Sequence, residues 1–195
     1  MEETIPCSHS RLIFTDSAAR SLEGVLKETA TTSLFVLADE HTCAAVAAPL
    51  IRAVPALSGA QVIVIPPGDD HKSLQSLSEV WQRLSVGGAT RSAMMVNIGG
   101  GMITDLGGFA AATFKRGIRF VNVPTSLLAA VDASLGGKTG INFNGLKNEV
   151  GVFNNAQCVI FYMPFLKTLD RQNLLSGYAE MIKHGLIDRE RTWAE

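Results

Sequence analysis

The sequence predicts an α/β fold, an open and mainly parallel β-sheet flanked by helices. Short runs of apolar and β-branched residues, bounded by turn formers or charge, recur along the chain as is typical of buried parallel strands. Helical patterns separate them, and the alternation repeats about every 30 residues, the length of a βαβ unit. The chain has 195 residues, 47% of them hydrophobic and 18% charged, which predicts one well-buried domain and excludes a disordered or coiled-coil protein.

Five apolar runs are the predicted strands of this sheet. They are Leu34–Leu37, Val62–Ile65, Met94–Ile98, Ile118–Val123 and Val159–Tyr162. The clearest helix begins near Ser73 and carries an apolar stripe that we interpret as core packing, made of Leu74, Leu77, Trp81 and Leu84. In such a sheet, ligands bind beyond the carboxyl ends of the strands.

Two features interrupt the alternation. Asn144-Gly145 predicts a β-hairpin, because both residues tolerate the positive φ of a type I′ turn. After Pro164 the strand pattern stops, and Leu174 to Ile187 has the pattern of a helix. The chain therefore passes from an α/β region into the start of an all-helical one.

The composition excludes several classes of protein. The net charge of −1 offers no global field for nucleic acid or an anionic membrane, so neither is an expected partner. The longest apolar stretch, Cys43–Ile51, is too short to span a bilayer and is interrupted by Pro49. The acidic start does not resemble an export signal, and we expect a cytoplasmic location. Residues 115–147 carry five cations and one acid, and this clustering predicts a small anionic ligand.

Three glycines, Gly99–Gly101, stand between a predicted strand and a helix. Backbone amides at such a turn and the helix dipole bind a phosphate or diphosphate, and glycine lets it approach closely. The dinucleotide pattern GxGxxG fits only in part, since Thr104 occupies its third glycine position, and a tight structural turn is the alternative. Asp105, one turn into the helix, either accepts bonds from a polar ligand or complements the helix dipole.

Lys138 follows Gly136-Gly137, but the stretch lacks the first glycine of a nucleoside-triphosphate loop, so we interpret Lys138 as a charge for an anionic substrate. A regular two-residue hairpin would pair Asn142 with Lys147. It would also place Lys147 on the sheet face of Lys138, about 13 Å away. Two solvated hairpin lysines are the alternative.

Two further stretches carry polar groups. Residues 68–73 read GDDHKS, at the same sheet edge as the glycine turn; Ser73 caps the next helix in one interpretation, and the acids and Lys72 bind a ribose or base in the other. Glu180, Lys183 and His184 share a helix face, although this spacing alone is weak evidence for a metal.

Three stretches of the sequence together resemble one known family. They read GDDHKS from Gly68, GGGMITDLGGFAAATFKRGIRFVNVPTSLLAAVDASLGGKTGINFNGLKN from Gly99, and SGYAEMIKHGLI from Ser176. The chain is identified by this resemblance as a member of the 3-dehydroquinate synthase family of the shikimate pathway. The family's members are NAD- and metal-dependent lyases that convert 3-deoxy-D-arabino-heptulosonate 7-phosphate to 3-dehydroquinate and phosphate. The resemblance implies a Rossmann-like NAD-binding domain at 1–168, the beginning of a helical metal and substrate domain at 169–195, and a homodimer.

The resemblance also implies roles for individual residues. NAD contacts would be Asp39, Asp69, Lys72, Gly100, Gly101, Met102, Asp105, Thr125, Ser126 and Thr168. Contacts to the sugar phosphate substrate would be Arg116, Asp132, Lys138, Lys147, Asn148 and Lys183. Glu180 would be one of three zinc ligands. Because Asn148 would point away in a regular hairpin, the resemblance further implies an irregular hairpin at that residue.

Family members are longer than this chain, and their other two zinc ligands are histidines that would follow Glu195. We therefore expect the chain by itself to bind NAD but to hold zinc poorly and to lack turnover. An exposed apolar surface is expected on the last helix, between Leu174 and Leu186. The alternatives are a sister sugar phosphate cyclase, a metal-dependent polyol dehydrogenase, and a non-catalytic nucleotide-binding module.

Overall fold

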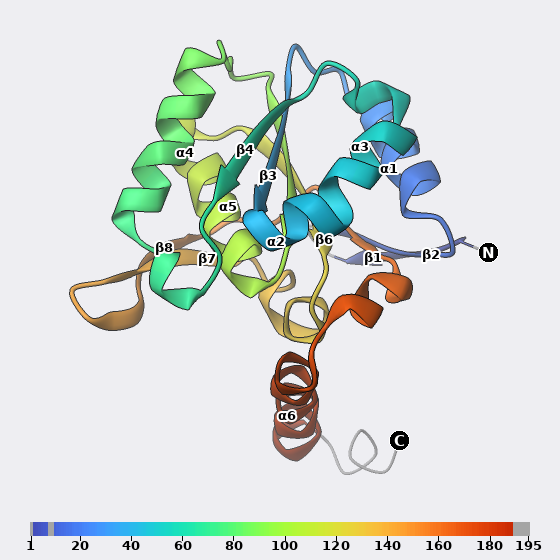
Figure 1. Ribbon diagram of the computed structural model, residues 1–195, viewed down its shortest axis with the longest axis vertical. Coiled ribbons are helices and arrows are strands. Elements are labelled where there is room, and N and C mark those ends of the chain that lie inside the picture. Colours follow the sequence, from blue (N-terminus) through green and yellow to red (C-terminus); the bar gives the residue numbers. More distant parts are fainter. Residues whose placement is uncertain (1, 8–9, 189–195) are drawn as a thin grey trace.

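The fold is built on one large β-sheet, seen in a computed structural model that describes residues 2–7 and 10–188 (Figure 1). The strands of the sheet are β1 (Glu2–Cys7), β2 (Ser10–Thr15), β3 (Leu34–Asp39), β4 (Gln61–Ile65), β5 (Met94–Gly99), β6 (Arg119–Pro124) and β9 (Cys158–Phe161). Their order across the sheet is β1-β2-β9-β6-β5-β3-β4. Only the β1–β2 pair among the described strands of this sheet is antiparallel, which confirms the predicted α/β, Rossmann-like fold class.

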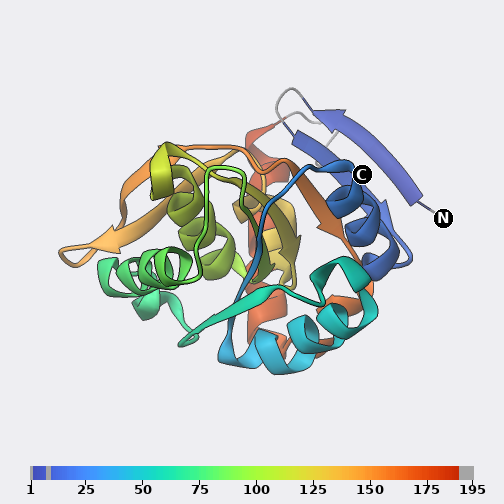
Figure 2. The ribbon, with the colours of Figure 1, turned by 90° about the horizontal axis from the view of Figure 1, so that it is seen from above.

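Helices and single helical turns connect the strands. The longer helices are α1 (Ala18–Glu28), α4 (Leu74–Val86), α5 (Gly101–Thr113) and α6 (Arg171–Ile187). The short ones are α2 (Glu40–Thr42), η1 (Cys43–Ala47), α3 (Ala48–Ala53), η2 (Pro55–Leu57), η3 (Asp69–His71), η4 (Phe114–Arg116), η5 (Ala129–Ala133) and η6 (Met163–Thr168). In Figure 2, α4 and α5 cover one face of the sheet while α1 and α3 cover the other.

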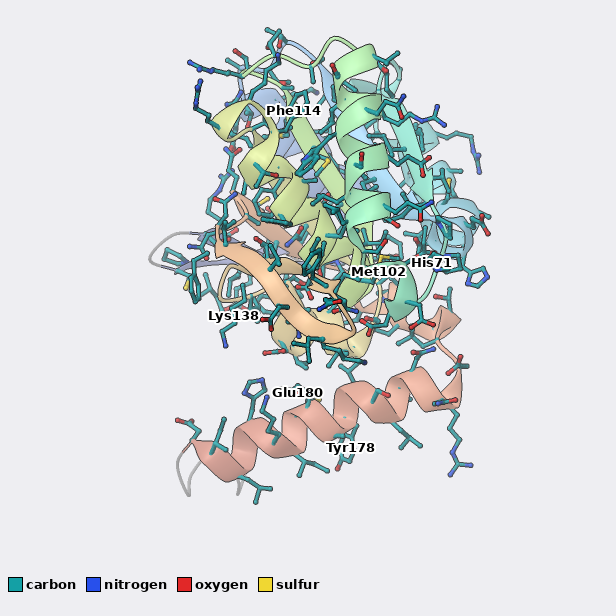
Figure 3. All side chains as sticks on the ribbon, turned by 90° about the vertical axis from the view of Figure 1, so that its left-hand side faces the viewer. His71, Met102, Phe114, Lys138, Tyr178 and Glu180 are labelled. Atoms are coloured by element: carbon teal, nitrogen blue, oxygen red, sulfur yellow. The ribbon has the colours of Figure 1, made fainter. Side chains whose placement is uncertain are left out.

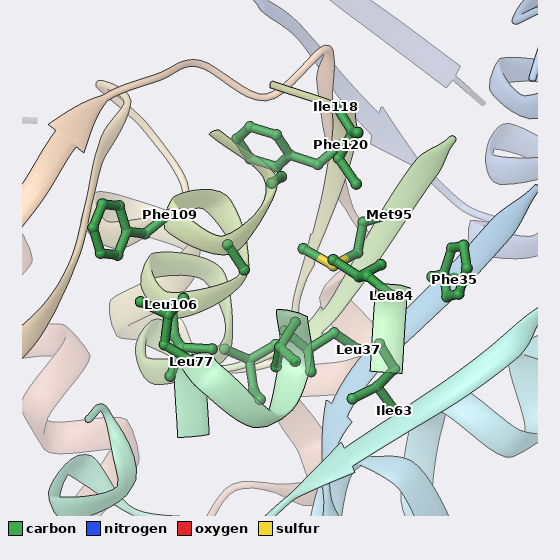
Figure 4. Packing of buried hydrophobic residues seen from close by; sticks show 14 of the residues in the cluster. Phe35, Leu37, Ile63, Leu77, Leu84, Met95, Leu106, Phe109, Ile118 and Phe120 are labelled. Carbon is green, nitrogen blue, oxygen red and sulfur yellow. The ribbon is translucent and has the colours of Figure 1, made fainter. Parts of the chain in front are cut away.

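Each face of the sheet has its own hydrophobic core, because successive strand residues point to opposite faces. Phe35 and Leu37 pack beneath α4 and α5 (Figure 4), while Val36 and Ala38 pack beneath α1 and α3. All four of these side chains are fully buried. The near-continuous apolar runs of the sequence arise from this burial on both faces.

The five predicted strands are confirmed, each overlapping an observed strand to within two residues at its ends. The β1–β2 hairpin was not predicted, because β1 is an exposed edge strand whose residues show no buried face. The predicted helix is α4, and Ser73 caps it by accepting a bond from the Ser76 amide. The predicted core stripe needs one correction: Leu74, in the first turn, is 49% exposed.

The chain leaves the large sheet twice. Strands β7 (Lys138–Phe143) and β8 (Leu146–Phe153) form the predicted hairpin, a separate two-stranded sheet that packs on α5. Helix α6 projects from the body and contacts η5 (Figure 1). Among its described residues, only Gly177 is buried. As expected, apolar side chains of α6 from Leu174 to Leu186 are exposed.

The predicted boundary between residues 168 and 169 falls just before α6, and residues 189–195 of the predicted second domain lie outside the described residues. That division remains a prediction. Within the described ranges, none of the helices is both long and apolar enough to cross a membrane.

Candidate functional site

The glycine turn lies at the carboxyl end of β5, as predicted. Gly99 ends the strand, Gly100 is the N-cap of α5, and no described side chain caps the helix. A Cβ on Gly99 would lie 2.6 Å from Ile103, so only glycine fits there. The first amides of α5 are therefore left for a ligand, the arrangement that binds a phosphate or diphosphate.

The next strand brings two predicted NAD contacts to the same turn. The Thr125 amide donates to the Gly99 carbonyl at 2.9 Å. A Cβ on Gly100 would lie 3.2 Å from the Ser126 hydroxyl. The ends of β5 and β6 thus form one edge, and Met102, labelled in Figure 3, lies in the first turn of α5 beside it.

A cavity of about 410 Å³ opens between α5, η5 and the β7–β8 hairpin. Four of its lining residues were predicted as site residues from the sequence: Asp105, Asp132, Lys138 and Asn148. Of these four residues, Asp105 was assigned to NAD, and Asp132, Lys138 and Asn148 were assigned to the substrate. The cavity therefore joins the predicted cofactor and substrate residues.

Lys72 is a nearly buried cation at the back of this site, with 5% of its surface exposed. Its ammonium donates to Asp105 Oδ2 at 3.0 Å and to Asn148 Oδ1 at 2.5 Å, and it lies 4.0 Å from Asp69 Oδ1. Burial raises the pKa of Asp105 above its ordinary value, and the Lys72 charge opposes that rise. A buried ammonium needs such partners, since an unpaired one would be costly.

Lys147 does not join Lys138 as the regular hairpin predicted. Its ammonium pairs with Asp69 Oδ2 at 2.9 Å, and Lys147 is not among the described residues that line the cavity. This hydrogen bond lowers the pKa of Asp69, and the carboxylate in turn raises the pKa of Lys147. The lysine is thus a bridge from the hairpin to η3.

The hairpin register explains the difference. Phe143 pairs with Leu146 as predicted, but the register shifts between Ile141 and Phe143, so that Ile141 faces Val150. The predicted pair of Asn142 with Lys147 is therefore wrong. Asn148 adopts a left-handed φ of 55°, which confirms the irregularity expected there.

Three potential metal donors come together where α6 meets η5. A carboxylate oxygen of Asp132, one of Glu180 and a ring nitrogen of His184 all lie within 4.8 Å of one another. His184 Nε2 lies 3.6 Å from both carboxylates and has no hydrogen-bond partner among the described residues. The family resemblance assigns Glu180 as a zinc ligand, and the helix face that Glu180 shares with His184 was weak evidence for a metal. The fold places Asp132 beside both of them.

Lys183 adds a positive charge to this cluster. Its ammonium donates to Glu180 Oε1 at 2.5 Å, and this bond raises the pKa of Lys183. Figure 3 shows Glu180 on the side of α6 that faces the Lys138 end of the body. The predicted substrate contact Lys183 thus lies beside the predicted metal ligand.

Two predicted NAD contacts have local structural partners. The Asp39 carboxylate, at the end of β3, caps α2 by accepting from the Thr42 amide at 2.8 Å. Thr168 ends η6, where its hydroxyl donates to the Phe165 carbonyl. Asp39 lies at the same sheet edge as the glycine turn, because β3 and β5 are parallel neighbours.

Arg116 lies at the opposite end of the molecule from the cavity. It follows the carboxyl end of α5, whose 13 residues separate it from the glycine turn by about 20 Å. Figure 3 shows the neighbouring Phe114 far from Met102 and Lys138. Lys115 precedes Arg116, and the Arg119 guanidinium donates to the Ala30 carbonyl at that end. The cations of 115–147 therefore form two groups, so the prediction of one cluster is wrong.

Asn142 is the residue of this site that the sequence reasoning missed. It was considered only as a hairpin position, yet its side chain contacts both Asp69 and Asn148. The signal available in the sequence was an asparagine just before the Asn144-Gly145 turn, which is too common a pattern to indicate a role.

Comparisons with known proteins agree with this geometry. The sequence model of a family described as 3-dehydroquinate synthase N-terminal matches residues 62–176. A 3-dehydroquinate synthase of Parabacteroides distasonis is 50% identical over 190 residues, which are 96% of this chain and 53% of that protein. One of Pyrococcus furiosus is 46% identical over 130 residues, 67% of this chain and 38% of that protein. The chain spans about half the length, or less, of these curated relatives.

Solved structures of sugar cyclases share the fold. A 2-deoxy-scyllo-inosose synthase complexed with carbaglucose-6-phosphate, NAD⁺ and Co²⁺ has a TM-score of 0.86 at 23% identity, covering 97% of this chain and 52% of its own. A 2-epi-5-epi-valiolone synthase from Streptomyces hygroscopicus with NAD⁺ and Zn²⁺ bound has a TM-score of 0.78 at 26% identity, covering 93% and 50%. By the family match and these identities, the chain belongs to the 3-dehydroquinate synthase family.

Proposed function

We propose that the protein containing this chain is a 3-dehydroquinate synthase, a lyase that converts 3-deoxy-D-arabino-heptulosonate 7-phosphate to 3-dehydroquinate and phosphate. The observation that carries this proposal is one cavity that joins Asp105, beside the glycine turn, to Asp132, Lys138 and Asn148. A cofactor at the turn and a phosphorylated substrate in the cavity would then meet at the same place.

The glycine turn fits the diphosphate of NAD, because its helix amides are uncapped and its glycines admit close approach. The residues that would hold NAD are those assigned from the family resemblance: at the ends of β3, β5 and β6, in and just after η3, in α5, and at the end of η6. The 2-epi-5-epi-valiolone synthase with NAD⁺ bound supports this cofactor.

The cluster of Asp132, Glu180 and His184 fits a divalent metal, since two carboxylates and one imidazole are a donor set that zinc accepts. Glu180 is the ligand that the family resemblance assigns. Asp132 also lines the cavity, so a substrate hydroxyl could lie between this cluster and Lys138.

When bound, NAD accepts and returns a hydride, and the metal acidifies the substrate hydroxyls. The chain's own residues bind and orient the substrate. Lys138 offers a point charge to an anionic group in the cavity, and Asn148 offers a side-chain amide to a hydroxyl. Lys183 places a second positive charge on the α6 side, beside Glu180. Arg116 does not reach this cavity within the same chain.

The test is an assay of the protein at its natural length with NAD, Zn²⁺ and 3-deoxy-D-arabino-heptulosonate 7-phosphate. We expect release of phosphate without net accumulation of NADH. Lys138→Met should lower kcat/KM by at least about 100-fold, because a charge-assisted contact to the substrate phosphate is lost. The matched control Lys27→Met changes an exposed lysine on α1 and should leave kcat/KM unchanged.

Other outcomes would decide among the alternatives. Activity on glucose 6-phosphate instead would indicate a sister sugar phosphate cyclase, and steady NADH accumulation with a polyol would indicate a dehydrogenase. The 195-residue chain alone should bind NAD without turnover, and calorimetric titration together with a phosphate-release assay tests both points. A homodimer and a cytoplasmic location are part of the same proposal.

A further inference from the structure

A closed ring of three hydrogen bonds connects the η3 loop to the β7–β8 hairpin. The backbone amide of Asn142 donates to the Lys72 backbone carbonyl at 2.7 Å, and the backbone amide of Asn148 donates to Asn142 Oδ1 at 3.0 Å. The Lys72 ammonium closes the ring by donating to Asn148 Oδ1. Each of these three residues is therefore held by the other two.

We propose that Asn142 is a positioning residue that couples nucleotide binding at η3 to substrate binding in the cavity. The proposal deepens the proposed function and rests on it, because that function assigns Asp69 and Lys72 to NAD and Asn148 to the substrate. Nothing in the sequence reasoning or in the family resemblance gives Asn142 a role.

The hairpin side of the ring needs Asn142 because Asn148 has left the regular ladder. The register shift after Ile141 frees the Asn148 amide from the pairing that a regular hairpin would give it. Its left-handed φ of 55° is an uncommon conformation, which local hydrogen bonds must stabilise. Asn142 Oδ1 supplies such a bond and so fixes the side-chain amide of Asn148 at the cavity.

The loop side uses the other end of the Asn142 side chain. Its Nδ2 donates to the Asp69 carbonyl at 3.1 Å and to Asp69 Oδ2 at 3.3 Å. An asparagine amide offers an acceptor and a donor on one short side chain, and this site uses both. The Asn142 side chain therefore contacts both Asp69 and Asn148 directly, beside the longer links through the Lys72 and Lys147 ammonium groups.

The ring also meets the cofactor carboxylate. Lys72, which closes the ring, pairs with Asp105 Oδ2 at 3.0 Å. A ligand that draws Asp69, Lys72 or Asp105 into a new position must either break the ring or move Asn148 with it. NAD and the sugar phosphate then favour the same arrangement of the ring, so each raises the affinity for the other by the same factor.

The coupling can be measured at equilibrium with metal-stripped protein of natural length, in which the substrate binds without turning over. The dissociation constant of NAD is determined by calorimetry with and without saturating 3-deoxy-D-arabino-heptulosonate 7-phosphate. We expect the substrate to tighten NAD binding roughly 5- to 100-fold in the wild type. In Asn142→Ala the factor should fall to about one, with NAD affinity in the absence of substrate within about 3-fold of the wild type.

Two further variants separate positioning from mere loss of structure. Asn142→Asp keeps the acceptor for Asn148 but sets a carboxylate against Asp69, so it should lose the coupling as well. Adding Asp69→Asn restores the hydrogen bond with its direction reversed, because residue 69 then donates and the carboxylate at residue 142 accepts. The double variant should regain coupling relative to Asn142→Asp, and Asp69→Asn alone is the reference. A purely structural loss would lower the melting temperature and both affinities together and would show no such rescue.

Amide hydrogen exchange gives a readout that does not depend on which sugar phosphate the protein uses. NAD alone should slow exchange at Asn142 and Asn148 in the wild type and not at Asn148 in Asn142→Ala. Unchanged exchange at Asn148 on NAD binding, or full coupling in Asn142→Ala, would overturn the inference. The proposed function fails separately, if the metal-loaded wild type releases no phosphate.

Discussion

Two regions of the molecule differ in how much of each element is buried. One is the large sheet with its two helical layers, and the other comprises α6 and the β7–β8 hairpin. Strands β3, β5 and β6 are buried on both faces between helices that belong to this chain. Every residue of β8 is exposed, and among the described residues of α6 only Gly177 is buried. The edge proposed for NAD therefore stands on a completed core. The side chains proposed for substrate and metal stand on largely exposed elements, of which the hairpin is anchored by the buried Ile141 and α6 by Gly177.

This difference shows which interactions fix the position of each group of site residues. The glycine turn is fixed by packing, since added atoms at Gly99 or Gly107 would collide with neighbouring side chains. Asn148 and Lys147 are fixed by hydrogen bonds and ion pairs to η3. Changes in packing within the large sheet should therefore act on stability, and changes in the polar contacts of the hairpin should act on binding.

The largest contrast is expected between matched leucines in the two regions. Leu37 is fully buried in β3, while Leu186 on α6 is 67% exposed. Leu37→Ala should lower the free energy of unfolding by about 2–5 kcal/mol, because it removes buried surface and leaves a cavity. Leu186→Ala should change it by less than about 0.5 kcal/mol. Urea denaturation measures both, and similar losses would contradict the contrast.

A second pair of variants tests the close packing of α5 on the sheet. A Cβ on Gly107 would lie 2.3 Å from Asn97 Oδ1, an atom inside the core, whereas one on Gly24 in α1 meets nothing within 4 Å. Gly107→Ala should cost about 1–3 kcal/mol through overpacking. Gly24→Ala should stabilise the chain by about 0.5–1 kcal/mol, since alanine favours helix. Thermal melting of the two variants in opposite directions is the expected result.

The contact between α6 and η5 can be loosened without a large change in stability. A Cβ on Gly177 would lie 2.6 Å from the Leu128 amide nitrogen, so Gly177→Ala should push α6 away and separate Glu180 from Asp132. The gain in helix propensity, about 1 kcal/mol, offsets part of the clash. Co²⁺ binding by the natural-length protein should weaken by about 10-fold, or about 1.4 kcal/mol. Ser176→Ala, on the exposed face of α6, is the control and should bind Co²⁺ normally.

The smallest effect is a pair of opposite pKa shifts at the junction of the two regions. The Lys147 hydrogen bond lowers the pKa of Asp69 below 3.8, so its charged form stabilises the fold above that pH, and the contribution is lost as pH falls through the folded-state pKa. Burial raises the pKa of Asp105 above 3.8, so its contribution is largest at low pH and declines as pH rises through its folded-state pKa.

Carbon-13 NMR of the two carboxyl groups measures these pKa values directly. Lys147→Met should bring the pKa of Asp69 back toward 3.8 and leave that of Asp105 unchanged. If both carboxyls titrate together in the wild type, the assignment of separate environments to Asp69 and Asp105 is wrong.

The regular part of the fold could be predicted from the sequence because strands that are buried on both faces have near-continuous apolar runs. The runs at Leu34–Leu37 and Met94–Ile98, apolar except for Asn97, show no regular alternation of polar and apolar residues. The turn after Ile98 needs glycine for steric reasons. The residue type of Ser73 and its position before the helix were enough to predict the N-cap that the structure shows. These features are local, so the sequence was enough.

The irregular part depended on contacts between distant segments. The left-handed backbone of Asn148 is stabilised by hydrogen bonds with both Lys72 and Asn142. Lys72 is far from the hairpin in the sequence, so the hairpin pattern could not predict its contact. Asp132 meets Glu180 and His184 only because α6 returns to η5. Arg116 was grouped with Lys138 because they are close in sequence, yet a strand and the turn of η5 carry the chain from one end of the sheet to the other between them.

Gly177, the one buried residue among those described in α6, is the point about which the helix would turn if it moved against η5. With a rise of about 1.5 Å per residue, Glu180 lies roughly 4.5 Å along the axis from Gly177, whereas Leu186 lies about three times as far. Any swing of the helix about this point displaces the distal leucine about three times as much as the carboxylate. The displacement is small at Glu180, which faces Asp132, but His184, the other donor on α6, lies roughly 10.5 Å from Gly177 and moves more than twice as far. A swing of α6 therefore changes the spacing of the three donors mainly at His184.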